Sequence, residues 1–211
     1  MTTFYFFDKN KMHQFHHAVA QTAQGVYSQF ERNLEAFGPL GISTFAACAG
    51  GAVVDSYRGR KPRDFDFMVL EDPKTAAEKD YSGAEEGVDV ISVPFIPNPA
   101  DPDADIEAYA KKASTFDISV CQVVVLPGRG VLATAEALTD LNLGVCRTTR
   151  PTPAARVQKY VRKGITDVRW DHDIIPESAS HRTRVGLDVK PKDVRVVRWT
   201  ENSALISRTG P

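Results

Sequence analysis

The sequence predicts an α+β domain with α/β character, in which a small mixed β-sheet is flanked by helices. The chain has 211 residues, of which 42% are hydrophobic and 25% are charged, ordinary proportions for a globular protein that buries a core. Short apolar runs of strand length alternate along it with segments of helical periodicity. We expect residues 1–164 to form this domain, including an N-terminal helix, and residues 165–211 to form a short appendage packed on it.

A long amphipathic helix is expected near the N-terminus. Asp8 is placed to cap a helix that starts directly after it. Apolar residues then recur at steps of three and four from Met12 to Phe37, which makes one apolar stripe. Gly38-Pro39 ends this pattern, so the helix should stop there.

The remaining elements follow from apolar runs and from the residues that interrupt them. Gly50-Gly51 breaks the first run, a polar stretch at 71–86 is read as irregular or helical, and the proline-rich stretch at 94–105 is read as a loop. The last helix has Thr152 as its cap, Pro153 as its first residue and Gly164 past its end. Strands are expected at 42–49, 65–70, 88–93 and 116–126, and short helices at 52–57, 106–113 and 152–164. Two β-prone runs follow at 194–199 and 204–207, and one reading of them is a small hairpin.

Composition and charge exclude several classes of protein. The 26 basic and 27 acidic side chains give a formal net charge of −1, which argues against a protein that coats nucleic acid. No apolar run approaches the ~20 residues of a membrane span, and the N-terminus lacks the pattern of a signal peptide. The 3 cysteines, irregularly spaced, read as buried thiols in a reducing compartment. We therefore expect a cytoplasmic protein with no membrane partner, whose basic stretch at 147–169 favours an anionic partner.

The residues that carry chemistry lie between 48 and 89. Gly50-Gly51 lets the backbone approach a bulky anion, although a plain turn is the alternative reading. Asp64 and Asp66 are two apart at the start of a strand, so their carboxylates share one face. Such a pair needs a cation between its members, and hard oxygen ligands suit Mg²⁺ (or Mn²⁺). Asp89, on the next strand unless it merely ends a loop, would complete a two-metal site of the kind used for phosphoryl and nucleotidyl transfer.

This segment resembles the head domain of class II nucleotidyltransferases, the tRNA CCA-adding enzymes and bacterial poly(A) polymerases of the DNA polymerase β superfamily. It is also similar to short phage-encoded proteins with that head. The resemblance covers roughly 42–164, on the order of one domain. The residues that carry it are Gly50-Gly51, Val53, Asp55, Gly59-Arg60, Pro62 and Asp64-Phe65-Asp66, followed by VDVI at 88–91 and FDIS at 116–119.

The resemblance implies a nucleotidyltransferase fold and a role for each matching residue. Asp64, Asp66 and Asp89 would be the catalytic residues and the metal ligands. The residues implied in nucleotide binding are Gly50 and Gly51 at the triphosphate, Asp117 at the sugar, and Arg156 and Lys159 at the nucleotide or an acidic acceptor.

The implied reaction is metal-dependent transfer of a nucleoside monophosphate from an NTP to an acceptor hydroxyl. The acceptor could be a tRNA or another RNA 3′ end, a protein or a small molecule, in the host cytoplasm if the protein is phage-encoded. Three departures from the family pattern are evident. Val54 stands where the family has an arginine, Ser114-Thr115 stand where its second motif begins with two arginines, and no segment matches the Glu-Asp…Arg template that selects CTP and ATP. Val54 and the missing template keep a second hypothesis open. The alternative is a nucleotidyltransferase-like binding module, or a phage effector that inhibits a host protein without catalysis.

Overall fold

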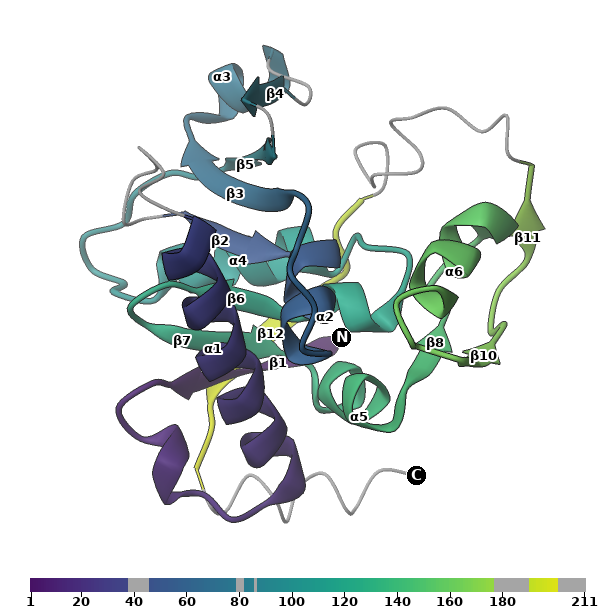
Figure 1. Ribbon diagram of the computed structural model, residues 1–211. Coiled ribbons are helices and arrows are strands. Elements are labelled where there is room, and N and C mark those ends of the chain that lie inside the picture. The colour runs from purple at the N-terminus through teal and green to yellow at the C-terminus, as the bar shows by residue number, and fades with distance from the viewer. Residues whose placement is uncertain (38–45, 79–81, 86, 177–189, 201–211) are drawn as a thin grey trace.

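A central eight-stranded mixed sheet organises the computed structural model, which describes residues 1–37, 46–78, 82–85, 87–176 and 190–200 (Figure 1). The strand order is β12-β1-β7-β6-β2-β3-β5-β4. The pairs β3–β5 and β1–β12 are parallel, and the others are antiparallel. The strands are β1 (Thr2–Asp8), β2 (Ala47–Ala49), β3 (Phe65–Glu71), β4 (Ser82–Glu85), β5 (Val88–Pro94), β6 (Val124–Leu126), β7 (Gly130–Ala133) and β12 (Val194–Arg198).

Helices cover both faces of this sheet, which confirms the predicted fold class. Figure 1 shows α1 in front of the sheet and α4 behind it, with α6 set to one side. Two further parallel pairs lie beside α6: β8 (Val145–Arg147) with β10 (Asp167–Arg169), and β9 (Thr152–Pro153) with β11 (Ile174–Ile175). The helices are α1 (Ala18–Phe37), α2 (Gly51–Tyr57), α3 (Pro73–Glu78), α4 (Ala104–Ala113), α5 (Ala135–Leu143) and α6 (Ala154–Val161), with 3-10 turns at Met12–Gln14 and Ser119–Gln122.

The N-terminus differs from the prediction. Residues Thr2–Asp8 form β1, a strand between β7 and β12, and the long helix begins at Ala18. Four aromatic residues, Phe4–Phe7, are buried on both faces of this strand, so the burial pattern gives no helical period. Asp8 accepts a hydrogen bond from the Asn10 backbone N–H at 2.8 Å and shapes a turn instead of a helix cap.

Three further predictions need correction. The expected strand at 116–126 contains the 3-10 turn at Ser119–Gln122, and sheet pairing starts at Val124. Pro153, and not Thr152, is the N-cap of α6, because both residues pair in β9 and the helix begins only at Ala154. The run at 194–199 joins β1 in parallel, with Trp199 stacked on Phe7 at 4.9 Å. Residues 42–45 and 204–207 of the other predicted strands lie outside the described residues.

The elements nearest the predicted chemistry agree with the sequence. Strands β3 and β5 and helices α2 and α4 match their predicted ranges to within two residues. The polar stretch at 71–86 holds α3 and β4. In the described part of the chain, no helix combines the length and the apolar character of a membrane span.

Candidate active site

The predicted aspartates meet at the start of two adjacent parallel strands. The pairing of β3 with β5 places Asp66 directly opposite Asp89, and Asp64 lies two residues before Asp66. The intervening Phe65 turns to the other face, where its ring meets Phe30 of α1 edge to face at 5.7 Å. Because side chains alternate along a strand, all three carboxylates lie on the sheet face opposite α1.

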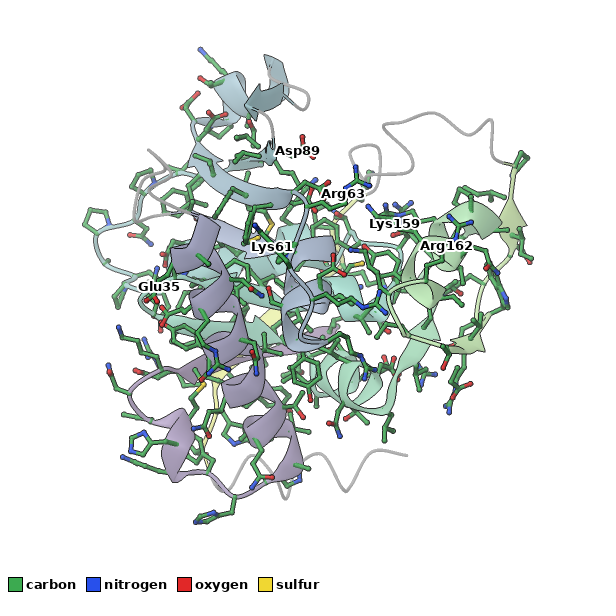
Figure 2. The ribbon with its side chains drawn as sticks, in the orientation of Figure 1. Glu35, Lys61, Arg63, Asp89, Lys159 and Arg162 are labelled. Atoms are coloured by element: carbon green, nitrogen blue, oxygen red, sulfur yellow. The ribbon has the colours of Figure 1, made fainter. Side chains whose placement is uncertain are left out.

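These carboxylates line one cavity of about 200 Å³, which we call the carboxylate cavity. Helix α6 contributes the opposite wall through Arg156, Lys159 and Tyr160, which its 3.6-residue period places on one face. Figure 2 shows Asp89 on β5 and Lys159 on α6, the two elements on either side of this cavity. The remaining lining residues are Gly50, Ile91, Phe116 and Cys121.

Asp66 is a carboxylate of the cavity whose pKa is raised. Burial is the main cause that raises its pKa to about 6. The charges of Lys159 and Arg156 lower this pKa, and the neighbouring carboxylates of Asp64 and Asp89 raise it. At neutral pH this side chain is ionised at a cost that a bound cation would relieve.

The carboxylates fit a divalent ion by their chemistry. They are hard oxygen donors, as Mg²⁺ and Mn²⁺ require, and no ion pair within the described residues engages Asp64, Asp66 or Asp89. In the described chain no three acidic, histidine or cysteine side chains are already drawn together as a ligand set. The three carboxylates therefore share a cavity without forming a closed site in this structure.

Gly50 and Gly51 occupy different environments. Gly50 lines the cavity with φ at +74°, and a Cβ there would lie 3.1 Å from Asp66 Oδ2. Both the backbone conformation and the close approach therefore require glycine. Gly51 is buried as the first residue of α2 and lies outside the cavity wall. Its carbonyl accepts a hydrogen bond of 3.4 Å from Lys163 Nζ.

Asp117 lies behind the cavity and holds one of its basic residues. Its side chain is 1% exposed, and its Oδ2 accepts a hydrogen bond from Arg156 Nε at 2.7 Å. Asp117 does not line the cavity, whereas Arg156 does. The backbone carbonyl of Asp117 also accepts from the Thr149 N–H at 2.9 Å. In this geometry the Asp117 carboxylate holds the Arg156 side chain in place.

Sequence analysis missed the ion pair between Lys163 and Asp55. Lys163, after the end of α6, pairs with the buried Asp55 of α2 and also reaches the Gly51 carbonyl. Arg60 reinforces the same junction by donating to the Arg162 carbonyl at 2.7 Å. The sequence does contain a sign of this pair, since Asp55 is an acid inside the apolar run of α2. A buried acid needs a cationic partner.

Comparisons with known proteins give distant structural matches. No family model and no curated protein matches the sequence. A CCA-adding enzyme in complex with CTP aligns over 70% of this chain and 38% of its own, at 17% identity and a TM-score of 0.37. The complex with ATP gives 17% identity and a TM-score of 0.36, over 70% of this chain and 36% of that one. The Thermotoga maritima CCA-adding enzyme complexed with tRNA gives 16% identity and a TM-score of 0.35, over 70% and 37%.

This chain thus spans 36% to 38% of the length of those enzymes. At such low TM-scores the likeness carries no functional conclusion, and the function of this chain has to follow from the cavity itself.

Proposed function

We propose that the protein is a metal-dependent nucleotidyltransferase, which transfers a nucleoside monophosphate from an NTP to an acceptor hydroxyl. The observation that carries this proposal is the cavity in which Asp64, Asp66 and Asp89 face Arg156 and Lys159. Carboxylates can hold divalent cations, and the two basic groups can bind the phosphates that those cations bridge. The sequence resemblance to the nucleotidyltransferase head supports the same reaction.

Each residue then has a defined task. Arg156 and Lys159 would bind and orient the triphosphate, and Gly50 would let the phosphates approach the backbone. The acceptor oxygen bonds to the α-phosphorus as the bond to the β-phosphate oxygen breaks, so pyrophosphate leaves and the hydroxyl proton passes to solvent. When bound at Asp64, Asp66 and Asp89, Mg²⁺ or Mn²⁺ would lower the pKa of the acceptor hydroxyl and offset the developing charge.

The acceptor is proposed from the resemblance and from local charge. An RNA 3′ end, including that of tRNA, fits the basic residues on α6, and a protein or small-molecule hydroxyl is the alternative. The resemblance to short phage-encoded proteins would place the reaction in the host cytoplasm.

The test is a transfer assay with each α-labelled NTP, Mg²⁺ or Mn²⁺, and a panel of RNA, protein and small-molecule acceptors. We expect label transfer and pyrophosphate release by the wild type, and neither by the variant that combines Asp64→Ala with Asp66→Ala. Asp72→Ala is the matched control, because Asp72 is an exposed acid just beyond the other end of β3.

One observation favours the non-catalytic hypothesis. Val54 is fully buried in α2, at the position where the family carries an arginine. A binding module would capture a stoichiometric host protein equally well with and without the double aspartate change, and would release no pyrophosphate. That pair of results would replace the enzymatic proposal.

A further inference from the structure

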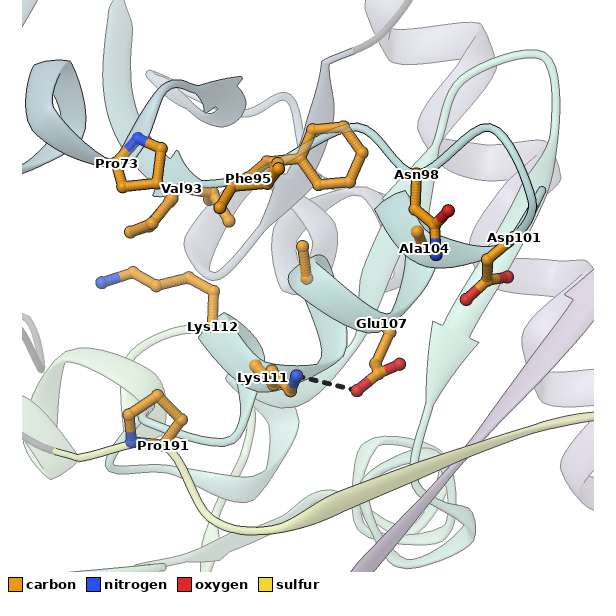
Figure 3. Close-up of a pocket in the computed structure, with 13 residues that line it drawn as sticks. Pro73, Val93, Phe95, Asn98, Asp101, Ala104, Glu107, Lys111, Lys112 and Pro191 are labelled. Atoms are coloured by element: carbon orange, nitrogen blue, oxygen red, sulfur yellow. Dashed lines mark ion pairs between the residues drawn. The ribbon is translucent and has the colours of Figure 1, made fainter.

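A second and larger cavity lies between the end of β5 and helix α4 (Figure 3). Its volume is about 510 Å³, within the ordinary range for a small-molecule site. Pro73, Val93, Phe95, Ala108 and Pro191 supply apolar surface on several sides. Its described lining residues differ throughout from those of the carboxylate cavity. We call it the Lys112 cavity.

Lys112 gives this cavity a buried cationic group. The residue is 9% exposed, and Figure 3 shows its side chain extending from α4 beneath Pro73 and Val93. No carboxylate of the described residues pairs with its ammonium group. Burial lowers the pKa of Lys112 to about 8, and the positive charge of Arg150 acts in the same direction.

Lys111, the residue before Lys112, differs from it in exposure and in charge pairing. Lys111 is exposed, and its Nζ lies 2.8 Å from Glu107 Oε1, so its charge is already neutralised at the rim. Helix α4 ends at Ala113, and a lysine in the last turn commonly faces solvent and the helix dipole. Lys112 instead bears its charge beside apolar walls and near a second cation, Arg150, and no acid among the described residues pairs with it.

The two ends of the Lys112 cavity carry side chains of opposite charge. Figure 3 shows Asp101 and Lys112 at opposite ends of the cavity. A ligand anion would therefore be repelled from the Asp101 end and attracted to Lys112. The apolar walls between them match a hydrocarbon body, since burying such surface is favourable.

We propose that the Lys112 cavity binds a small amphipathic monocarboxylate, with its hydrocarbon part against Val93, Phe95 and Ala108 and its carboxylate on the Lys112 ammonium. This site is independent of the proposed transferase reaction. Along β5 it lies four residues beyond Asp89, which corresponds to about 13 Å of extended strand.

Binding of octanoate and 1-octanol, measured by titration calorimetry at pH 7, tests the proposal with the wild-type protein. The two probes share one hydrocarbon length and differ in charge. We expect octanoate to bind at least about tenfold more tightly, since a charge-assisted hydrogen bond distinguishes them. Equal affinities, or no octanoate binding, would overturn the proposal.

Two lysine variants locate the interaction. Lys112→Met keeps the length and apolar character of the side chain, and should weaken octanoate binding about tenfold while leaving octanol binding nearly unchanged. Lys111→Met removes the same charge one residue away and should change octanoate affinity by less than about threefold. Unchanged octanoate affinity in a folded Lys112→Met protein would show that the carboxylate binds elsewhere, against the proposal.

Discussion

Asp66 of β3 and Asp89 of β5 are direct partners in a parallel strand pair, so two carboxylates stand side by side on one face of the sheet. Sheet geometry enforces this proximity, because neighbouring strands lie roughly 4.8 Å apart. Together with burial, the Asp89 charge raises the pKa of Asp66. The arrangement costs stability in the absence of a cation, which is typical of a site kept for function.

The first prediction concerns Asp66→Asn and pH. The pKa of Asp66 is about 6 in the folded protein and 3.8 as a free side chain, so ionisation favours the unfolded chain. The unfolding free energy of the wild type should fall as pH rises between these values, and the asparagine variant should escape that loss. Urea unfolding measures the unfolding free energy of the variant minus that of the wild type. This difference should be larger at pH 7.5 than at pH 3.5, by on the order of 2 kcal/mol in favour of the variant.

Asp64→Asn is the control for that experiment. Asp64 is exposed and is only one of the causes that raise the pKa of Asp66, so its substitution should stabilise the protein at pH 7.5 by less than Asp66→Asn does. A stability difference between wild type and Asp66→Asn that stays the same from pH 3.5 to 7.5 would contradict the burial of a destabilised carboxylate.

The second prediction uses the stability that the ionised Asp66 costs the folded protein. A bound cation should restore that stability, so metal binding can be detected without an activity assay. We expect Mg²⁺ or Mn²⁺ to bind the folded site and to raise the melting temperature of the wild type at pH 7.5. Saturation at a hundred times the dissociation constant corresponds to about 2.7 kcal/mol. The variant combining Asp64→Asn and Asp66→Asn should show no such rise in differential scanning fluorimetry. An equal rise in both proteins would place the ion elsewhere.

The third prediction compares two glycines that have a similar positive φ. Gly50 has φ at +74° and Gly59 has φ at +69°, but an added Cβ would approach Asp66 only at Gly50. At Gly59 no atom lies within 4 Å of the added Cβ. Gly59→Ala should therefore cost roughly 1 kcal/mol of unfolding free energy from backbone strain alone, and Gly50→Ala more.

A double variant separates the two contributions. In an Asp66→Ala background the extra cost of Gly50→Ala over Gly59→Ala should shrink, because the contacting carboxylate is gone. A remainder is expected from the ψ of −136° at Gly50, which residues other than glycine rarely adopt together with a positive φ. An undiminished extra cost in thermal or urea unfolding would mean that the contact with Asp66 is not its cause.

The fourth prediction concerns the Lys163–Asp55 pair that joins α6 to α2. Lys163→Met would leave Asp55, which is 7% exposed, as a buried charge without a partner. The unfolding free energy should fall by about 3 kcal/mol or more. Arg162→Met, one residue away, is the control, since this exposed side chain should change it by less than about 0.5 kcal/mol.

Removing both partners distinguishes a lost ion pair from a packing defect. The variant combining Asp55→Asn with Lys163→Met contains no unpaired charge, and it should unfold at higher urea concentration than Lys163→Met alone. If the double variant is the less stable of the two, the pair is not the source of the loss.

The sequence predicted the parts of the site that depend on local pattern. The alternation in DFDF predicts a strand with two carboxylates on one face, and the parallel β3–β5 pair then brings Asp89 to them. The features that the sequence does not predict depend on distant partners. β1 is a strand because β7 and β12 flank it, and the burial of Asp117 is matched by Arg156, which arrives from 39 positions away. No local periodicity encodes either relationship.

The last prediction tests the assignment of Asp117 as a positioning residue. If Asp117 acts by holding Arg156, Asp117→Ala and Arg156→Ala should weaken NTP binding by similar factors, and the double variant should be no weaker than Arg156→Ala. Titration calorimetry with a non-hydrolysable NTP and Mn²⁺ measures this directly. If Asp117 contacted the nucleotide itself, the two losses would add. Asp117→Asn keeps an acceptor for the Arg156 Nε–H, so it should recover part of the affinity, whereas a direct contact through the negative charge predicts no recovery.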